Sequence, residues 1–350
     1  MSEKTRSTIV RVTLLLLLLG FVVLVTREFT SARQLLSTVS SVIWYLAVAA
    51  LILQAVYYGV YALLNQVGLL IVGVKLPWTS LWQIVLVSIA LNIVVPAGGL
   101  GGAAVFVDAA VQHNQSGART TAGQLLVLAA DMATTLPFIL WGILVLGVNN
   151  VLQGYDVLGV VLFVLAVIFL LGPLAFARWK LKWLLVTTQW VQNTINHIGG
   201  WFHHPRLLEE DWAEQQAKQF SDASQAIGDN QKALWEIIGL AFILHPITIL
   251  EIYLLFLSLQ QPVSLGTLVA GVSLGIVFNF IAITPEGVGA VEGVMATVFY
   301  SLGAAPQKAI AITLMYRVLS VWIPVIVGLI LAQRMRIFSV KRVPETSGKQ

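Results

Sequence analysis

The sequence predicts an all-α, polytopic membrane protein with inverted repeats that contain Pro/Gly-broken helices. Hydrophobic residues make up 58% of the 350 residues and charged residues only 10%, whereas soluble domains carry about 25% charged residues. Most of the chain therefore cannot face water. Its apolar stretches run for roughly 18 to 25 residues without the alternation of barrel strands, so the spans are helices. The absence of Cys excludes disulfides and thiolate metal sites.

Charged residues gather in three segments: residues 1–11, 178–232 and 334–350 hold 4, 12 and 6 of them. The remaining sequence is almost free of charge and divides into ten apolar runs. These fall at about 9–26, 41–64, 81–95, 98–111, 121–148, 157–177, 234–257, 266–283, 287–303 and 308–333.

The first run has the basic flank of a signal peptide but no small-residue cleavage site after it, so we expect an uncleaved span. With a cytoplasmic N-terminus and all ten runs crossing, 16 Lys and Arg residues lie inside, three lie outside and Arg317 lies in the membrane. The positive-inside rule supports this topology, in which both termini are cytoplasmic. The pI of about 9.3 then reflects orientation and contact with anionic lipids, and nucleic acid is not expected as a partner.

The 178–232 segment is expected to hold a Trp-rich stretch at headgroup level and then a cytoplasmic helix over 206–232, whose apolar positions recur at helical spacing. His197, His203 and His204 lie here without Cys, and we interpret them as interfacial polar residues. No Walker A, GxGxxG or HExxH motif occurs. The sequence thus predicts no metal, no cofactor and no use of ATP.

Two stretches interrupt otherwise continuous apolar sequence, and each places an Asn before a Pro and then glycines. They are Asn92, Pro96, Gly98 and Gly101 in the first, and Asn279, Pro285, Gly287 and Gly289 in the second. Pro lacks a backbone donor and Gly permits positive φ, so both helices should break. Such breaks persist in a membrane only when they are buried in protein or line a polar cavity. A simple Pro kink closed by neighbouring Ser or Thr is the alternative.

The segments after the breaks also correspond. Asp131 lies six residues before Pro137 and Arg317 lies seven before Pro324, and the Pro-to-Pro distances are 41 and 39 residues. On the charge-derived topology the two copies are inverted. Inverted halves with broken helices are typical of secondary transporters, whose sites lie at the repeat interface. The same pattern would also describe a scaffold that moves nothing.

Ionisable residues at membrane depth are expected to face the bundle interior with partners, because each costs roughly 2.5–3.5 kcal/mol at a helix centre. Arg317 suits a phosphate or carboxylate headgroup. One hypothesis pairs Arg317 with Asp131 across the repeat axis. A second has Glu292 pair with Arg317 when the site is empty. The alternative is that such pairs only fix helix packing. The residues concerned are Asp131, Glu251, Glu286, Glu292 and Arg317, with His245 close to Glu251 in sequence.

The second break carries a family resemblance. Pro285-Glu-Gly287-Val-Gly289-Ala-Val-Glu292, then Tyr316-Arg317 and Trp322-Ile-Pro324, resembles the transmembrane region of the flippase-like lysylphosphatidylglycerol synthases, over about residues 10–335. Many members follow the first break with Gly-Glu and an Arg, where this chain has Ala103, Ala104 and Phe106. The resemblance implies a transmembrane domain at 1–335, a tail at 336–350 and, with about 17 residues after the last span, no aminoacyl-transferase domain.

The resemblance implies a flippase-like protein of the bacterial plasma membrane, not an enzyme, that binds or translocates an anionic or aminoacylated lipid. Its substrate-binding candidates are Arg317, Glu292, Glu286, Asp131, Asn92, Asn279 and Tyr316. Two alternatives stay open: a scaffold that serves a separate synthase or glycosyltransferase through 178–232, and an intramembrane transferase. Without an ATP site, transport would run downhill or couple to an ion gradient, with buried carboxylates as proton sites.

Overall fold

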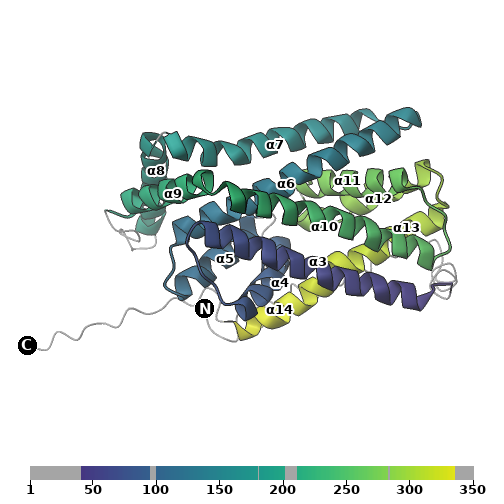
Figure 1. Ribbon diagram of the computed structural model, residues 1–350, viewed down its shortest axis with the longest axis horizontal. Helices are drawn as coiled ribbons and strands as arrows, with labels where there is room; N and C mark the ends of the chain where they lie inside the picture. Colours follow the sequence, from purple (N-terminus) through teal and green to yellow (C-terminus); the bar gives the residue numbers. More distant parts are fainter. Residues whose placement is uncertain (1–40, 95–99, 180, 202–210, 283, 336–350) are drawn as a thin grey trace, which may run out of the picture.

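The computed structural model describes residues 41–94, 100–179, 181–201, 211–282 and 284–335, and this part of the chain is helical without strands (Figure 1). The first half holds α3 (Trp44–Ile71), α4 (Trp78–Val94), α5 (Leu100–Gln112), α6 (Gly117–Val148) and α7 (Gly154–Trp179), followed by α8 (Leu181–Trp201) and α9 (Trp212–Asp229). The second half holds α10 (Gln231–Ser258), α11 (Leu265–Ile281), a 3₁₀ turn (Pro285–Gly287), α12 (Ala290–Ser301), α13 (Pro306–Arg317), a π turn (Val318–Trp322) and α14 (Ile323–Arg334). The predicted fold class is confirmed.

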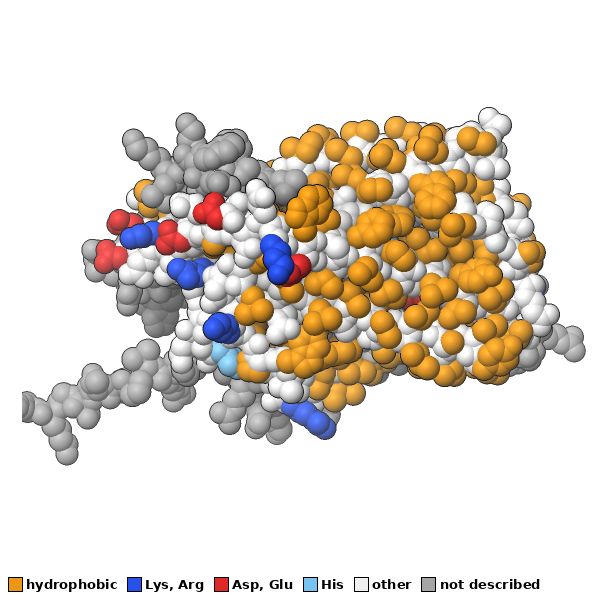
Figure 2. Space-filling model, viewed as in Figure 1, with side chains coloured by type: hydrophobic (Ala, Val, Ile, Leu, Met, Phe, Trp, Pro, Cys, Tyr) orange, Lys and Arg blue, Asp and Glu red, His pale blue; other side chains and the backbone are white. Residues whose placement is uncertain are grey.

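Four stretches of helix are long and apolar enough to cross a membrane. They are α3, α6, α10 and the continuous stretch from α13 to α14, with 28, 32, 28 and 29 residues. Apolar side chains cover the helices over most of their length, and charged side chains gather at the end where α8 and α9 lie (Figure 2). We call this the α9 end. The predicted first span, 9–26, lies outside the described residues.

The pairs α4–α5 and α11–α12 form two re-entrant hairpins. Their helices have 17 and 13 residues in the first hairpin and 17 and 12 in the second. Even 17 residues rise only about 25 Å, which is less than the hydrocarbon core of about 30 Å. The prediction that all ten runs cross is therefore wrong for 81–95, 98–111, 266–283 and 287–303. Hydropathy alone cannot separate a hairpin from two spans, and the assignment of the loops is unchanged because each hairpin returns to its own side.

The hairpins enter from opposite ends of the bundle (Figure 1). The loops that flank α4–α5 lie at the α9 end, where Ser116 donates a hydrogen bond to Gln219 of α9. At the opposite end, Ile43 N donates to Ser258 O at 2.8 Å and Lys308 Nζ donates to Gln260 O at 3.3 Å, which joins the loops beside α11–α12. The predicted inversion of the two copies is thus present in the packing.

Each half packs its long helix on the hairpin of the other half, through a glycine. A Cβ on Gly142 of α6 would lie 3.1 Å from Ala270 Cα of α11, and a Cβ on Gly328 of α14 would lie 2.1 Å from Leu86 O of α4. These glycines follow Pro137 and Pro324 by five and four residues. The helices α3 and α10 pack along each other between the two halves. The result is a two-fold arrangement around α3 and α10.

The predicted helix in the 178–232 segment is present as α9. Its apolar side faces the bundle, where Ala223 and Ile227 are buried, and α9 packs on both α6 and α7. Residues 202–210, including the start of the predicted helix, lie outside the described part. The side chain of His197, and the residues His203 and His204, also lie outside the described part.

Candidate functional site: a polar cavity between the two breaks

The second break is a short irregular segment between α11 and α12. Three of its described residues have positive φ: Glu286 (48°), Gly287 (63°) and Gly289 (89°). At Gly287 a Cβ would also lie 3.0 Å from Asn279 Cα and 2.6 Å from Val291 Cγ2, so only glycine fits. The helix breaks where the Pro and Gly pattern predicts.

Glu292 caps the broken end of α12 and also holds Arg317. Its Oε2 accepts a hydrogen bond from Gly289 N at 2.7 Å, and its Oε1 accepts one from Arg317 Nε at 2.7 Å. Arg317 Nη2 donates to Glu286 O, a carbonyl that the break leaves without a helical donor. The side chains of Arg317 and Glu292 are only 5% and 9% exposed. The second pairing hypothesis, Glu292 with Arg317, is confirmed.

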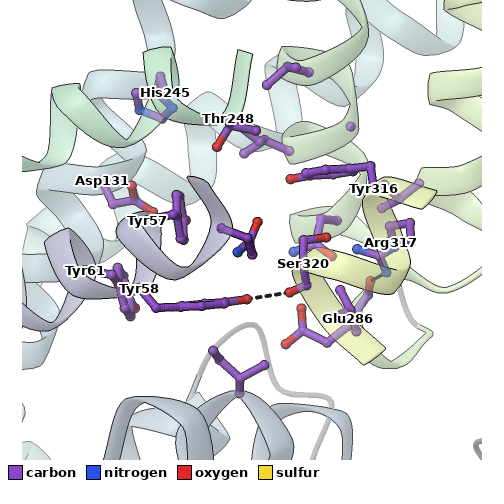
Figure 3. Close-up of a pocket in the computed structure, with 18 of the residues that line it drawn as sticks. Tyr57, Tyr58, Tyr61, Asp131, His245, Thr248, Glu286, Tyr316, Arg317 and Ser320 are labelled. Carbon is purple, nitrogen blue, oxygen red and sulfur yellow. Dashed lines mark hydrogen bonds between the residues drawn. The ribbon is translucent and has the colours of Figure 1, made fainter. Parts of the chain in front are cut away.

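The pair between Asp131 and Arg317 is not formed. Figure 3 places Asp131 beside Tyr57, on the other side of the space from Arg317. No partner contacts the Asp131 carboxylate within the described part of the chain, although its backbone carbonyl accepts from Thr134 and Thr135. That hypothesis is wrong because Glu292 and Glu286 O lie on the hairpin next to Arg317 and occupy its donors. Equivalent positions in two repeats need not meet.

Arg317 is followed by a π turn over Val318–Trp322. Pro324 has no N–H, so the carbonyl of Ser320, four residues earlier, loses its helical donor. Tyr58 Oη of α3 donates to this carbonyl at 2.6 Å. The side chain of Tyr58 thus satisfies a backbone group that the proline leaves free.

The first break is described only at its two sides, because Pro96 and Gly98 lie among residues 95–99, which the structure does not describe. Asn92 at the end of α4 accepts a hydrogen bond from Gly102 N at 2.5 Å and thereby caps α5. Gly101 is buried beside it. Asn92 and Glu292 therefore have one role in common: each side chain accepts a hydrogen bond from a backbone N–H at the start of the helix that follows the break.

Asn92, beside the first break, and Asn279 and Glu286, at the second break, line one polar cavity of about 260 Å³ (Figure 3). Six of the seven predicted substrate-binding residues line the cavity: Asn92, Asp131, Asn279, Glu286, Tyr316 and Arg317. The seventh, Glu292, lies behind Arg317. The cavity also receives Gln54, Tyr57, Tyr58 and Tyr61 from α3, and His245 and Thr248 from α10.

A second space, of about 310 Å³, lies on the other side of Glu292, between α12 and α13. Gly289, Gly293, Thr297 and Tyr300 line it, and all four are exposed on the outer face of α12. We call it the α12–α13 groove. The ion pair between Arg317 and Glu292 separates the groove from the cavity, since Arg317 borders the cavity and Glu292 borders the groove.

The comparison with known families matches residues 8–328 to the transmembrane region of lysylphosphatidylglycerol synthase. The chain belongs to this family. A UPF0104 membrane protein of Methanothermobacter thermautotrophicus is 22% identical over 283 residues, which cover 78% of this chain and 80% of the relative. Similar proteins of the same description match shorter parts: one of Pyrococcus horikoshii is 27% identical over 119 residues (34% of this chain, 36% of the relative), and one of Methanocaldococcus jannaschii is 33% identical over 99 residues (27% and 30%). The last two matches thus cover about a third of each relative.

The family match includes both breaks, the cavity and α8–α9, so the site belongs to the shared transmembrane region. The sequence analysis missed the contribution of α3. Gln54, Tyr57, Tyr58 and Tyr61 follow the spacing i, i+3, i+4, i+7 within an apolar run, which places them on one helix face. This polar stripe was a readable signal for a helix that faces a cavity.

Proposed function

We propose that this protein of the lysylphosphatidylglycerol synthase transmembrane-region family translocates a phospholipid by holding its headgroup in the central cavity. The observation that carries the proposal is Arg317, a buried cation at the wall of a polar cavity, tied to a carboxylate that borders a groove on the outer face. A guanidinium binds phosphate oxygens through two parallel hydrogen bonds. At membrane depth an ionisable side chain in a cavity marks a substrate path.

The rest of the lining indicates the kind of headgroup. Asp131 and Glu286 bring carboxylates, and Tyr57, Tyr61 and Tyr316 bring aromatic rings that attract cations. A headgroup with a phosphate and an ammonium would satisfy both, with the phosphate on Arg317 and the ammonium between Asp131 and the tyrosines. We therefore propose zwitterionic or aminoacylated phospholipids as the substrate class.

Binding would act on the second hairpin. A phosphate on Arg317 displaces Glu292, and Glu292 also caps α12 through Gly289 N. The exchange thus loosens the hairpin and opens the partition between the cavity and the α12–α13 groove. In this scheme the α9 end faces the cytoplasm of a plasma membrane, because Lys75, Arg119 and the described part of the 178–232 segment lie there. Tags at residue 150 or 261 should then be accessible from outside, and tags at 205 or 345 only after permeabilisation.

A scaffold that docks a separate enzyme through α9 is less well supported. The apolar side of α9 already packs on α6 and α7 of the same chain. Only the polar side of α9 is then left for contact with a partner.

The test is lipid transfer in phosphatidylcholine vesicles with three acyl-labelled lipids: phosphatidylglycerol, phosphatidylethanolamine and lysyl-phosphatidylglycerol. The fluorescence left after a reductant destroys the outer-leaflet label measures transfer. We expect wild type to move the last two fastest. Arg317→Lys should keep the fold and lose transfer roughly tenfold or more, since the planar fork is lost. Arg334→Lys, on the exposed last turn of α14, is the matched control. Wild-type rates for Arg317→Lys would refute the binding role.

A further inference from the structure

Glu251 is a carboxyl group with no exposed surface, and it does not border the cavity. It lies on α10 where this helix packs on α3, and its relative exposure is 0%. No Lys, Arg or His pairs with it in the part of the chain that the structure describes. The ionisable side chains near it are Tyr58 of α3 and Tyr316 of α13; α6 and α11 bring none close to it. An unpaired buried carboxylate is strongly disfavoured in such a place.

The polar neighbour of Glu251 is the amide of Gln54, which separates it from the cavity. One heteroatom of this amide lies 2.6 and 3.1 Å from the two Glu251 oxygens, and the other lies 3.1 Å from Tyr58 Oη. Gln54 and Tyr58 border the cavity. Glu251 is therefore connected to the cavity by one side-chain amide.

Counting donors places the hydrogen atoms in the row of hydrogen bonds from Glu251 through Gln54 and Tyr58 to Ser320 O. Tyr58 Oη has a single hydrogen, and it donates this hydrogen to Ser320 O at 2.6 Å. Towards Gln54, Tyr58 Oη can then only accept, so the Gln54 amide presents its NH₂ group to Tyr58 and its carbonyl oxygen to Glu251. Glu251 must in turn donate to that oxygen, which it can do only when its carboxyl group is protonated.

An ionised Glu251 requires the opposite arrangement. It accepts hydrogen bonds from the NH₂ group of Gln54, whose carbonyl oxygen then faces Tyr58. Tyr58 donates its single hydrogen to Gln54 and no longer to Ser320 O. The two protonation states thus differ in whether α3 is bound to the π turn. Ser320 follows Arg317 by three residues, which is about one helical turn.

We propose that Glu251 is the binding site of a coupling proton, which Gln54 and Tyr58 link to the π turn behind Arg317. This inference rests on the function proposed above. With the proton bound, Tyr58 holds the π turn and Arg317 stays on Glu292. When the Gln54 amide turns and the proton passes to water in the cavity, the NH₂ group of Gln54 faces the carboxylate, Ser320 O is released and the helix carrying Arg317 is free to follow the headgroup.

The first experiment tests the proton without any transport. Infrared spectra of the purified protein at neutral pH should contain the C=O stretching band of a protonated carboxylic acid, which the difference between wild type and Glu251→Gln assigns to Glu251. Glu236→Gln, at an exposed position of the same helix, is the control and should leave the band in place. A difference spectrum without this band would overturn the proposal.

The second experiment tests the coupling, with the three labelled lipids in the same vesicles. A pH gradient should speed transfer by wild type in one direction. Glu251→Gln keeps the donor of the protonated state and should transfer lipid without any response to the gradient. Tyr58→Phe leaves the carboxyl group intact but removes the link, and should also lose the response while keeping the infrared band. A Glu251→Gln protein that responds like wild type would refute the coupling role. A wild type that retains the band but moves no lipid would refute the proposed function and leave the proton site standing.

Discussion

The hairpin α4–α5 is capped by a neutral amide, whereas the hairpin α11–α12 is capped by a carboxylate. Asn92 accepts from Gly102 N and has no charged partner, while Glu292 accepts from Gly289 N and from Arg317 Nε. The long helices differ in the same way. The helix α6 continues through Pro137, whereas the equivalent helix is divided by a π turn before Pro324. The same backbone arrangement therefore occurs in both halves, and among the described residues only the second half connects it to a charge that an anion can displace.

The largest difference should appear on removal of the buried cation. Arg317→Gln leaves Glu292 buried without its partner, and breaking a buried pair on one side costs about 3–5 kcal/mol. We expect a large fall in melting temperature in detergent, together with loss of lipid transfer.

The double variant Arg317→Gln with Glu292→Gln separates the two effects. It removes both charges, so most of the stability should return while lipid transfer stays lost. An unchanged melting temperature in the single variant would mean that the pair between Arg317 and Glu292 does not stabilise the second hairpin.

A smaller effect is expected where each long helix crosses the opposite hairpin. Gly328→Ala places a methyl group 2.1 Å from a backbone oxygen, and Gly142→Ala places one 2.4 Å from the Ser273 hydroxyl, which can rotate away. Both should destabilise by about 1–3 kcal/mol, and Gly328→Ala should lie at the upper end. Thermal unfolding of both variants, with Gly239→Ala on open surface as the control, measures this order. The reverse order would show that the two crossings are not equivalent.

The cap of the first hairpin should contribute less. Asn92→Ala removes the acceptor for Gly102 N and should cost about 1 kcal/mol, as helix N-caps do. Its lipid transfer should fall only in proportion to the amount of folded protein. A specific loss of transfer at full stability would place the first hairpin in the moving part of the protein.

The smallest change in stability is expected for Asp131→Asn, although Asp131 occupies the place of Arg317 in the other repeat. Its carboxylate has no partner to lose in the described structure, so the melting temperature should stay within error or rise. Transfer of lysyl-phosphatidylglycerol should fall more than transfer of phosphatidylglycerol. An equal fall for both lipids would remove Asp131 from recognition of the headgroup amine.

The sequence contained the elements of this site but not their partners. The Pro and Gly pattern predicted the break at Gly287 because a backbone rule acts locally. The partner of Arg317 depended on depth in the bundle, and Asp131 and Glu292 are both acids within apolar runs. Only the length of the helices around Pro285 identifies a hairpin. The linkage of Glu251 to Tyr58 through Gln54 joins two helices that are far apart in the chain, and no local pattern indicates it.

The hydrogen bond between Tyr58 and Ser320 also has a consequence for biosynthesis. It joins residues 262 positions apart, in the first and the last of the long helices that the structure describes. A ribosome that adds about 5–20 residues per second needs roughly 13 to 50 s to make the intervening chain. During this interval α3 stays in the membrane with its polar stripe facing no finished cavity, and α4 lacks the helix that packs on Leu86. We therefore expect the insertion machinery to shield the polar stripe of α3 from lipid until the last helix has been made.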